Sequence, residues 1–167
     1  YTSGTTGNPK GVLYSHRGLV LSSMAICTPR AINLYVTETV LPVVPMFHVN
    51  GWCIPYAALM SGAKLVLAGP MLDGKSLYEL IEAEGVTVSA GVPTIWHALA
   101  QYLDESGHRF STMRRTVVGG SAMPVALSGV TWTLTAERTR AIVAAETESG
   151  DEKPLLSWRP STAASSD

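Results

Sequence analysis

The chain opens on a run of glycine and hydroxyl residues that ends at a single lysine, Tyr1-Thr2-Ser3-Gly4-Thr5-Thr6-Gly7-Asn8-Pro9-Lys10-Gly11. Glycine lets the backbone adopt positive φ and approach a ligand closely, so consecutive N–H groups can converge on an anion. Ser3, Thr5 and Thr6 add hydroxyl donors. The ammonium of Lys10 adds a point charge that suits phosphate oxygens. The run therefore predicts a phosphate-binding loop.

This loop differs from the Walker A pattern, because Pro9 stands where the second glycine belongs and Gly11 follows the lysine. A flexible Gly/Ser/Thr linker is the ordinary alternative, but a linker has no need of the fixed Pro-Lys-Gly ending. The run resembles the signature of the adenylate-forming superfamily, [ST]-S-G-[ST]-[ST]-G-x-P-K-G, which residues 2–11 fulfil throughout. This superfamily contains acyl-CoA synthetases, the adenylation domains of peptide synthetases, and luciferases.

Three later segments resemble acyl-CoA synthetases in the same order along the chain: Pro45-Met46-Phe47-His48, Gly91-Val92-Pro93-Thr94 and Gly119-Gly120-Ser121-Ala122. Each alone has an ordinary structural explanation, as a core histidine, a helix start and a turn. Four matches in order favour the family. The first and last of these segments look similar to those of medium-chain fatty-acyl-CoA and methylmercaptopropionyl-CoA ligases.

The resemblance implies three groups of site residues. The ATP phosphates would be held by Thr2, Ser3, Gly4, Thr5, Thr6, Gly7 and Lys10. The acyl pocket or the coenzyme A route would be shaped by His48, Trp52, Pro93 and Thr94. The adenine and the acyl phosphate would lie beside Gly119, Gly120, Ser121 and Ala122. The resemblance assigns no catalytic residue and no metal ligand to this chain.

The reaction implied by the resemblance is that of an acid–thiol ligase. A carboxylic acid, with a fatty acid favoured, would be activated by ATP and Mg²⁺ as an acyl-adenylate and then transferred to coenzyme A. The Y-G-x-T-E motif and the small domain with the catalytic lysine are not found, so we expect this chain alone to have little or no ligase activity.

Three alternatives stay open from the sequence. The first is a non-catalytic nucleotide-binding or interaction fragment. The second is an amino-acid-activating adenylation domain, which would need an aspartate to meet the substrate ammonium, and none is suitably placed. The third is a generic α/β domain in which the loop occurs by chance. The acyl chain length and the oligomeric state are not determined by these motifs.

Helical periodicity alternates with short apolar runs, which is typical of βαβ units and a parallel sheet. We expect strands at 40–46, 64–68, 86–90 and 116–118, and helices at 15–26, 54–60, 75–84 and 94–103. The last helix should turn Ile95, Leu99 and Tyr102 inward. The fold predicted by resemblance is α/β, a partial N-terminal subdomain of an acyl-CoA synthetase-like fold with a mostly parallel sheet flanked by helices. Three matched segments follow strand carboxyl ends, where ligands gather.

The resemblance ends near residue 124, so we expect a partial AMP-binding domain over 1–124 and a divergent tail over 125–167. The tail is rich in Thr, Ala, Ser, Glu and Arg, which is typical of poorly ordered sequence. The abrupt end of the resemblance suggests a shifted reading frame or a splice to unrelated sequence. A local helix could form over 137–148. Because the chain begins inside its own phosphate-loop motif, we interpret it as a fragment.

Composition limits the class of protein. The 167 residues are 46% hydrophobic and 15% charged with a net charge of -1, which gives no electrostatic case for nucleic acid or an anionic membrane as partner. Cys27 and Cys53 lack metal-site spacing and are interpreted as reduced thiols, which favours the cytoplasm. The longest apolar stretch, 40–60, is broken by prolines and polar residues and is not expected to span a membrane.

Overall fold

The computed structural model describes residues 1–2, 7–120 and 140–143. Within these residues one sheet has the strand order β2-β1-β3-β4-β5. The strands are β1 (Thr39–Val43), β2 (Lys64–Leu65), β3 (Val88–Gly91), β4 (Arg115–Val118) and β5 (Arg140–Val143). All four neighbouring pairs are parallel. The expectation of an α/β fold with a parallel sheet is therefore confirmed.

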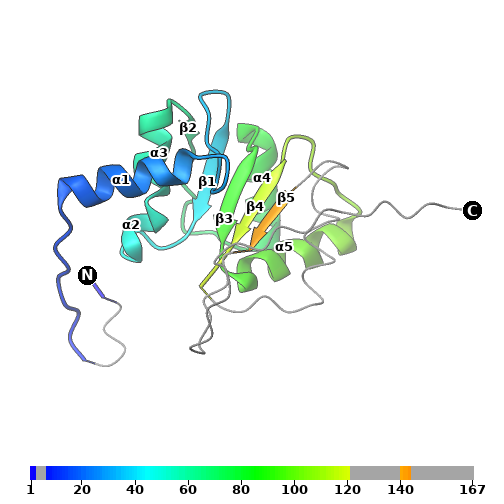
Figure 1. Ribbon diagram of the computed structural model, residues 1–167. Helices are drawn as coiled ribbons and strands as arrows, with labels where there is room; N and C mark the ends of the chain where they lie inside the picture. The colour runs from blue at the N-terminus through cyan, green and yellow to red at the C-terminus, as the bar shows by residue number, and fades with distance from the viewer. Residues whose placement is uncertain (3–6, 121–139, 144–167) are drawn as a thin grey trace, which may run out of the picture.

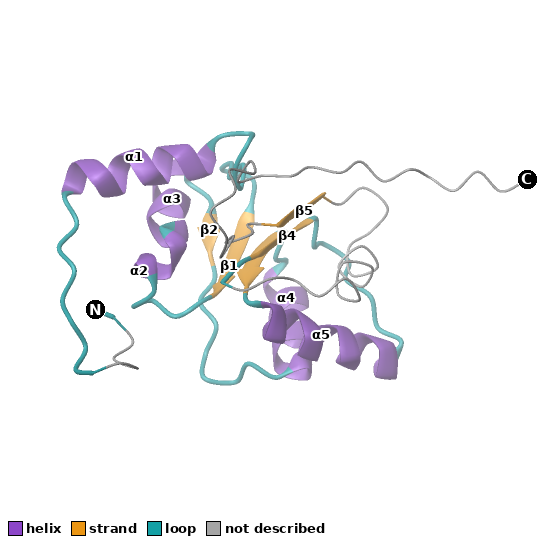
Figure 2. Ribbon diagram, turned by 60° about the horizontal axis from the view of Figure 1, so that its bottom comes forward, coloured by secondary structure: helices purple, strands orange, loops and turns teal. Residues whose placement is uncertain are grey.

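Helices cover both faces of this sheet (Figures 1 and 2). On one side lie α1 (His16–Cys27) and α3 (Ile54–Ser61), and on the other lie α4 (Gly74–Glu84) and α5 (Pro93–Ser106). A short segment, α2 (Val49–Trp52), follows β1 at its carboxyl end. The chain thus has the layered βαβ arrangement in which ligands usually bind beyond the carboxyl ends of the strands.

Successive side chains of the strands point to opposite faces of the sheet and pack into two separate apolar cores. Leu41 and Val118 point to the α4–α5 side, where they pack with Leu77, Ile81, Trp96 and Leu99. Val40, Val88 and Val117 point to the α3 side, where they pack with Ile54, Ala57 and Ala58. Successive strand residues face opposite sides of a sheet, so apolar runs such as residues 40–43 feed both cores.

The ends of the helices are set by capping residues in the local sequence. The side chains of Ser15 and Asp73 accept hydrogen bonds from the backbone N–H groups of Gly18 and Ser76, which caps α1 and α4. Helix α3 ends at Gly62 with φ of 75°, and α4 ends at Gly85 with φ of 65°. Glycine takes this left-handed conformation without the steric cost of a Cβ atom.

Several sequence expectations need correction. Residues 140–143 form strand β5 rather than part of a helix. Strand β2 covers only Lys64–Leu65 of the expected 64–68. Trp96, which was not assigned to the inner face of α5, is 1% exposed and central, while Ile95 and Tyr102 are only partly buried. The indole N–H of Trp96 donates to the carbonyl oxygen of Gly91, which satisfies its one polar group.

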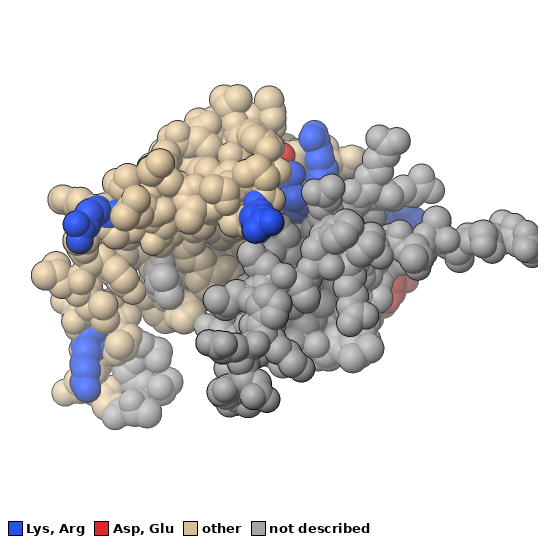
Figure 3. Space-filling view, viewed as in Figure 1, with Lys and Arg blue, Asp and Glu red and all other residues tan. Residues whose placement is uncertain are grey.

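The helices on the two faces differ in charge. The exposed side of α4 carries Lys75 and Glu79, an i,i+4 pair that is solvent-exposed. Helix α1 carries Arg17 in its first turn and no other Lys, Arg, Asp or Glu, and Figure 3 shows no acidic side chain over it. Among the described helices, none combines the length and apolarity that a bilayer span requires.

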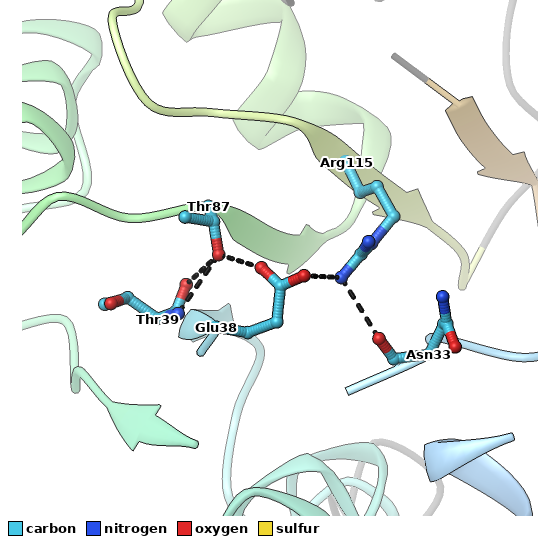
Figure 4. Close-up of polar contacts among 5 residues, drawn as sticks. All are labelled: Asn33, Glu38, Thr39, Thr87 and Arg115. Atoms are coloured by element: carbon cyan, nitrogen blue, oxygen red, sulfur yellow. Dashed lines mark hydrogen bonds and ion pairs between the residues drawn. The ribbon is translucent and has the colours of Figure 1, made fainter. Parts of the chain in front are cut away.

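The amino edge of the sheet is closed by a polar network (Figure 4). Nη2 of Arg115 donates to Oε1 of Glu38 at 2.6 Å and to the carbonyl oxygen of Asn33 at 3.1 Å. The Thr87 hydroxyl donates to the other Glu38 oxygen and accepts from the N–H of Thr39 at 3.0 Å. Because Glu38 is only 4% exposed, its charge depends on these partners.

Candidate functional site

The carboxyl ends of β1, β3 and β4 bring three of the sequence-matched segments to one edge of the sheet. Residues 44–48 follow β1, Val92 and Pro93 follow β3, and Gly119 and Gly120 follow β4. Residues beyond the carboxyl ends of parallel strands share one edge, because all strands run in the same direction. The expected convergence of these segments at one edge of the sheet is therefore present in the fold.

The indole ring of Trp52 lies against the Gly119–Gly120 backbone. A Cβ atom built at Gly119 would lie 3.0 Å from Cη2 and 3.4 Å from Cζ2 of Trp52. A Cβ atom at Gly120, where φ is 85°, would lie 3.1 Å from Cγ1 of Val92. A Cβ atom would therefore be crowded at both positions, and at Gly120 the backbone conformation also favours glycine.

Gly91 links the strands beneath this contact. Its carbonyl oxygen accepts from Nε1 of Trp96 at 3.1 Å and from the N–H of Gly119 at 3.4 Å. Pro93 is buried at the first position of α5, where its missing N–H costs no helical hydrogen bond, and Thr94 is exposed. The Gly91-Val92-Pro93-Thr94 segment therefore lies beneath the contact of Trp52 with Gly119. Of Pro93 and Thr94, only Thr94 faces solvent.

A left-handed turn positions Trp52. Asn50, Gly51, Trp52 and Cys53 all have positive φ, between 48° and 63°. A left-handed conformation costs a residue with a Cβ atom about 1–2 kcal/mol, and a Cβ atom at Gly51 would meet Sδ of Met46 at 3.0 Å. This turn was not expected from the sequence, in which the Asn50-Gly51 pair is the one local signal for it.

His48 contributes its backbone to this turn. Its carbonyl oxygen accepts from the N–H groups of Gly51 at 2.9 Å and Trp52 at 3.3 Å. Its side chain is exposed. His48 therefore sits at the entrance to the turn, and its expected place in the acyl pocket or the coenzyme A route stays a prediction.

The described part of the phosphate loop is tied at its base. The N–H of Thr2 donates to the carbonyl oxygen of Lys10 at 2.9 Å, and the N–H of Lys10 donates to Oγ1 of Thr2 at 3.0 Å. Gly7 has φ of 144° and nothing within 4 Å of a built Cβ atom. Thr2, Gly7 and Lys10 are all exposed, so the loop offers its groups to solvent.

The described loop residues, 1–2 and 7–11, make no hydrogen bond to Trp52 or Gly119 at the edge of the sheet. In both ribbon views, the segment between the loop and α1 runs beside the helices and away from the sheet. Four loop residues, Ser3, Gly4, Thr5 and Thr6, and two residues of the last segment, Ser121 and Ala122, lie outside the described residues. A single site that includes both parts stays a prediction.

Electrostatics at the site come from few groups. Burial raises the pKa of the Cys53 thiol at the end of the left-handed turn, which keeps it protonated near neutral pH. Within residues 1–2 and 7–120, no three His, Cys, Asp or Glu side chains are grouped as a metal site requires. Of the loop side chains expected to bind phosphate, the described residues include only Thr2 and Lys10.

A family model described as AMP-binding enzyme matches residues 1–143. The chain is 62% identical over 127 residues to a long-chain-fatty-acid–CoA ligase of Thermus thermophilus, covering 76% of this chain and 24% of that protein. It is 57% identical over 127 residues to a medium-chain-fatty-acid–CoA ligase of Ectopseudomonas oleovorans, covering 76% and 23%. The chain thus spans about a quarter of the length of these curated relatives.

The fold is similar to that of a solved domain. The inhibitor-bound N-terminal domain of FACL13 from Mycobacterium tuberculosis matches with a TM-score of 0.70 at 28% identity, covering 88% of this chain and 35% of that one. The family match also runs through β5 and past residue 124, where the sequence motifs end. The domain boundary expected at that residue stays a prediction.

Proposed function

The chain belongs to the AMP-binding enzyme family, and we propose that it is part of an ATP-dependent acyl-CoA ligase that activates a carboxylic acid and passes it to coenzyme A. The observation that carries this proposal is the contact of Trp52 with Gly119 at the carboxyl edge of the sheet. It brings the segment expected to line the acyl pocket against the segment expected to run beside adenine.

The first half-reaction needs positioning and charge neutralisation more than covalent chemistry. A carboxylate oxygen forms a bond to the α-phosphorus of ATP, and the bond from that phosphorus to the β-phosphate bridging oxygen breaks as pyrophosphate leaves. Lys10 would neutralise charge on the β- and γ-phosphates, with the hydroxyl and N–H groups of residues 2–7 as further donors. The Thr2–Lys10 hydrogen bonds support this role, because they hold the lysine backbone at the loop base.

The second half-reaction uses the other side of the proposed site. The coenzyme A thiolate forms a bond to the acyl carbon, and the bond from that carbon to the AMP oxygen breaks. His48, Trp52, Pro93 and Thr94 would border the acyl group and the thiol route, and the Gly119–Gly120 backbone would lie beside adenine and the acyl phosphate. Neither glycine has a Cβ atom at a place where one would be crowded, which lets the Trp52 ring and the Val92 side chain approach this backbone closely.

Mg²⁺ would neutralise phosphate charge during the first half-reaction. Among the described residues no three His, Cys, Asp or Glu side chains are grouped, and we assign no Mg²⁺ ligand to this chain. The free substrates of the whole protein would be a carboxylic acid, ATP and coenzyme A, with no nucleic-acid partner. The reduced thiols expected from the sequence favour the cytoplasm as the location.

The named relatives favour this proposal over an amino-acid-activating adenylation domain. The two curated relatives that align over 127 residues are named as fatty-acid–CoA ligases, whereas the likeness to a peptide-synthetase structure is only 23% identical and shows the fold alone. An amino-acid substrate also brings an ammonium group that needs a carboxylate. Among the described residues 44–53, 91–94 and 119–120 there is no Asp or Glu.

A chimera tests the proposed activity. Residues 1–120 of this chain would replace the matching segment of the Thermus thermophilus ligase, and pyrophosphate release from ATP would be measured with acetate, octanoate, palmitate and leucine. The proposal expects release that depends on a fatty acid and that falls at least about tenfold in Lys10→Ala, the loss of one charged contact. Release with leucine alone, or none from a folded chimera, would contradict it.

A further inference from the structure

Trp96 of α5 is enclosed in the core on the α4–α5 side of the sheet, where it is 1% exposed. An apolar aromatic ring could fill this place without a polar group to bury. The indole N–H instead donates to the carbonyl oxygen of Gly91 at 3.1 Å. Trp96 therefore directs a hydrogen bond from the core to one defined backbone atom at the carboxyl end of β3.

Gly91 lies directly before the N-cap of α5, which is Val92. Valine has no side-chain oxygen with which to cap the first turn. Gly91 and Trp96 occupy the two positions, before the cap and four residues into the helix, whose side chains often pack together and fix the angle at which the chain enters. Gly91 has no side chain for such a contact, so the hydrogen bond from Trp96 takes its place and fixes the orientation of the Gly91 carbonyl group.

The same carbonyl oxygen links β3 to the segment that follows β4. It also accepts from the N–H of Gly119, at 3.4 Å, which is long for a backbone hydrogen bond. A carbonyl oxygen has two lone pairs and can serve both donors. A hydrogen bond of this length weakens further when its acceptor turns away, so the position of Gly119 depends on the orientation that Trp96 gives to Gly91.

The next residue of each segment makes a second contact. A Cβ atom built at Gly120 would lie 3.1 Å from Cγ1 of Val92, and Val92 follows the Gly91 carbonyl directly in the chain. The Gly119–Gly120 backbone is thus held by one hydrogen bond and one packing contact. Both come from the two residues whose orientation Trp96 sets.

We propose that Trp96 is a positioning residue, which through the Gly91 carbonyl holds the Gly119–Gly120 backbone where adenine and the acyl phosphate would lie. The inference rests on the proposed function, because that function gives these two glycines their role. Trp96 itself touches no ligand, since it is enclosed in the core, and it acts only through the backbone of Gly91.

Amide hydrogen exchange of the purified chain, followed by NMR, measures this link without any need for activity. Trp96→Phe removes the indole N–H and keeps an aromatic ring in the core. Leu99→Val is the matched control, because Leu99 is fully buried in the same helix and the same core and has no polar group to offer Gly91. The exchange rate of the Gly119 amide is divided by that of the β4 amides, which removes any change in overall stability.

The expected result is that this ratio rises at least about tenfold in Trp96→Phe, because the hydrogen bond that orients the acceptor of the Gly119 N–H is lost. In Leu99→Val the ratio should equal that of the parent chain. An unchanged ratio in Trp96→Phe, or an equal rise in both variants, would overturn the inference, because Trp96 would then act in the core alone.

A second variant covers the case in which Trp96→Phe does not fold. Benzothienylalanine, introduced in place of Trp96, replaces the ring N–H by sulfur and keeps the shape of the indole. It removes the hydrogen bond to Gly91 with little change in packing, so the same rise in the exchange ratio is expected. A ratio equal to that of the parent chain would overturn the inference.

The chimera with the Thermus thermophilus ligase separates this inference from the proposed function. Trp96→Phe in the chimera should raise the KM for ATP at least about threefold and leave that for octanoate unchanged, while Leu99→Val should change neither. An unchanged KM for ATP in an active chimera would overturn the positioning role. A folded chimera that releases no pyrophosphate would contradict the proposed function, and the exchange ratio would still decide whether Trp96 positions Gly119.

Discussion

The indole of Trp52 packs on Gly119 so closely that a single added methyl group would lie 3.0 Å from its Cη2 atom. The two residues belong to segments 67 positions apart (119 - 52) that follow β1 and β4. Strand β3 lies between these strands in the sheet, so the contact spans its carboxyl edge. We take this contact as the structural centre of the proposed site.

Gly119→Ala should displace the Trp52 ring. The new methyl group meets the far end of an aromatic side chain, which yields more easily than backbone, so we expect a shift in tryptophan emission with little loss of stability. Gly119→Ala should cause no such shift in a Trp52→Phe background, which would show that the emission change comes from Trp52 and not from the other tryptophans. Gly69→Ala, with nothing within 4 Å of its built Cβ atom, is the control. An identical shift with and without Trp52 would contradict the contact.

Gly74→Ala should destabilise the chain by crowding α4 against α5. A Cβ atom there would lie 2.4 Å from the carbonyl oxygen of Ala98 and 2.7 Å from Cβ of Tyr102. Overpacking of this kind costs about 1–3 kcal/mol, because neither backbone nor Cβ can move aside. Urea unfolding measures the loss, again beside Gly69→Ala. A stability equal to that of the parent chain would mean that α4 and α5 are not this close.

Glu38→Ala should be far more costly than loss of a surface ion pair. Removing the carboxylate leaves the Arg115 guanidinium, with a side chain 15% exposed, without its 2.6 Å partner. Breaking a buried pair costs about 3–5 kcal/mol, whereas Glu79→Ala, which breaks the exposed pair with Lys75, should cost about 0–1 kcal/mol. Thermal melts of both variants give the comparison. Similar small losses would show that Glu38 is solvated.

Asp73 should make the start of α4 sensitive to acid. The Ser76 N–H at 3.0 Å and then the Ser76 hydroxyl at 2.7 Å hold the pKa of Asp73 below its ordinary value of 3.8. A carboxylate with a lowered pKa adds stability that is complete above the unfolded value and is lost as the pH falls through the folded value. Asp73→Asn keeps a capping oxygen without titrating.

The expected result is a melting midpoint for the parent chain above that of Asp73→Asn at neutral pH, with the difference shrinking as the pH falls below 3.8. Thermal melts at a series of pH values measure it. A difference that stays constant over this range would mean that the Asp73 charge does not contribute to the cap.

Local chemistry predicted much of the fold. The helices expected at 15–26, 54–60 and 75–84 lie within one residue of α1, α3 and α4 at each end, because Ser15 suits a helix N-cap and Gly62 and Gly85 suit helix ends. The parallel sheet followed from the alternation of apolar runs and helical periodicity. Strand β5 was not predicted, because residues 140–143 owe their conformation to pairing with β4 rather than to local sequence.

The contact between Glu38 and Arg115 and the left-handed turn that positions Trp52 could not be predicted from the sequence. Glu38 and Arg115 are 77 positions apart, and neither carries a local sign of its partner. The left-handed turn at Asn50–Cys53 includes three residues that have a Cβ atom and rarely adopt positive φ. In contrast, the segments that follow β1, β3 and β4 were placed correctly at one edge, because parallel strands require it.

Calorimetric titration of the purified chain with ATP and Mg²⁺ tests the central claim most directly. We predict saturable binding that weakens at least about tenfold in Lys10→Ala, which removes one charged contact, while Lys75→Ala on α4 leaves it unchanged. A soluble chain with a cooperative melt that binds no ATP, or binds it equally in both variants, would contradict a nucleotide site built on the opening loop.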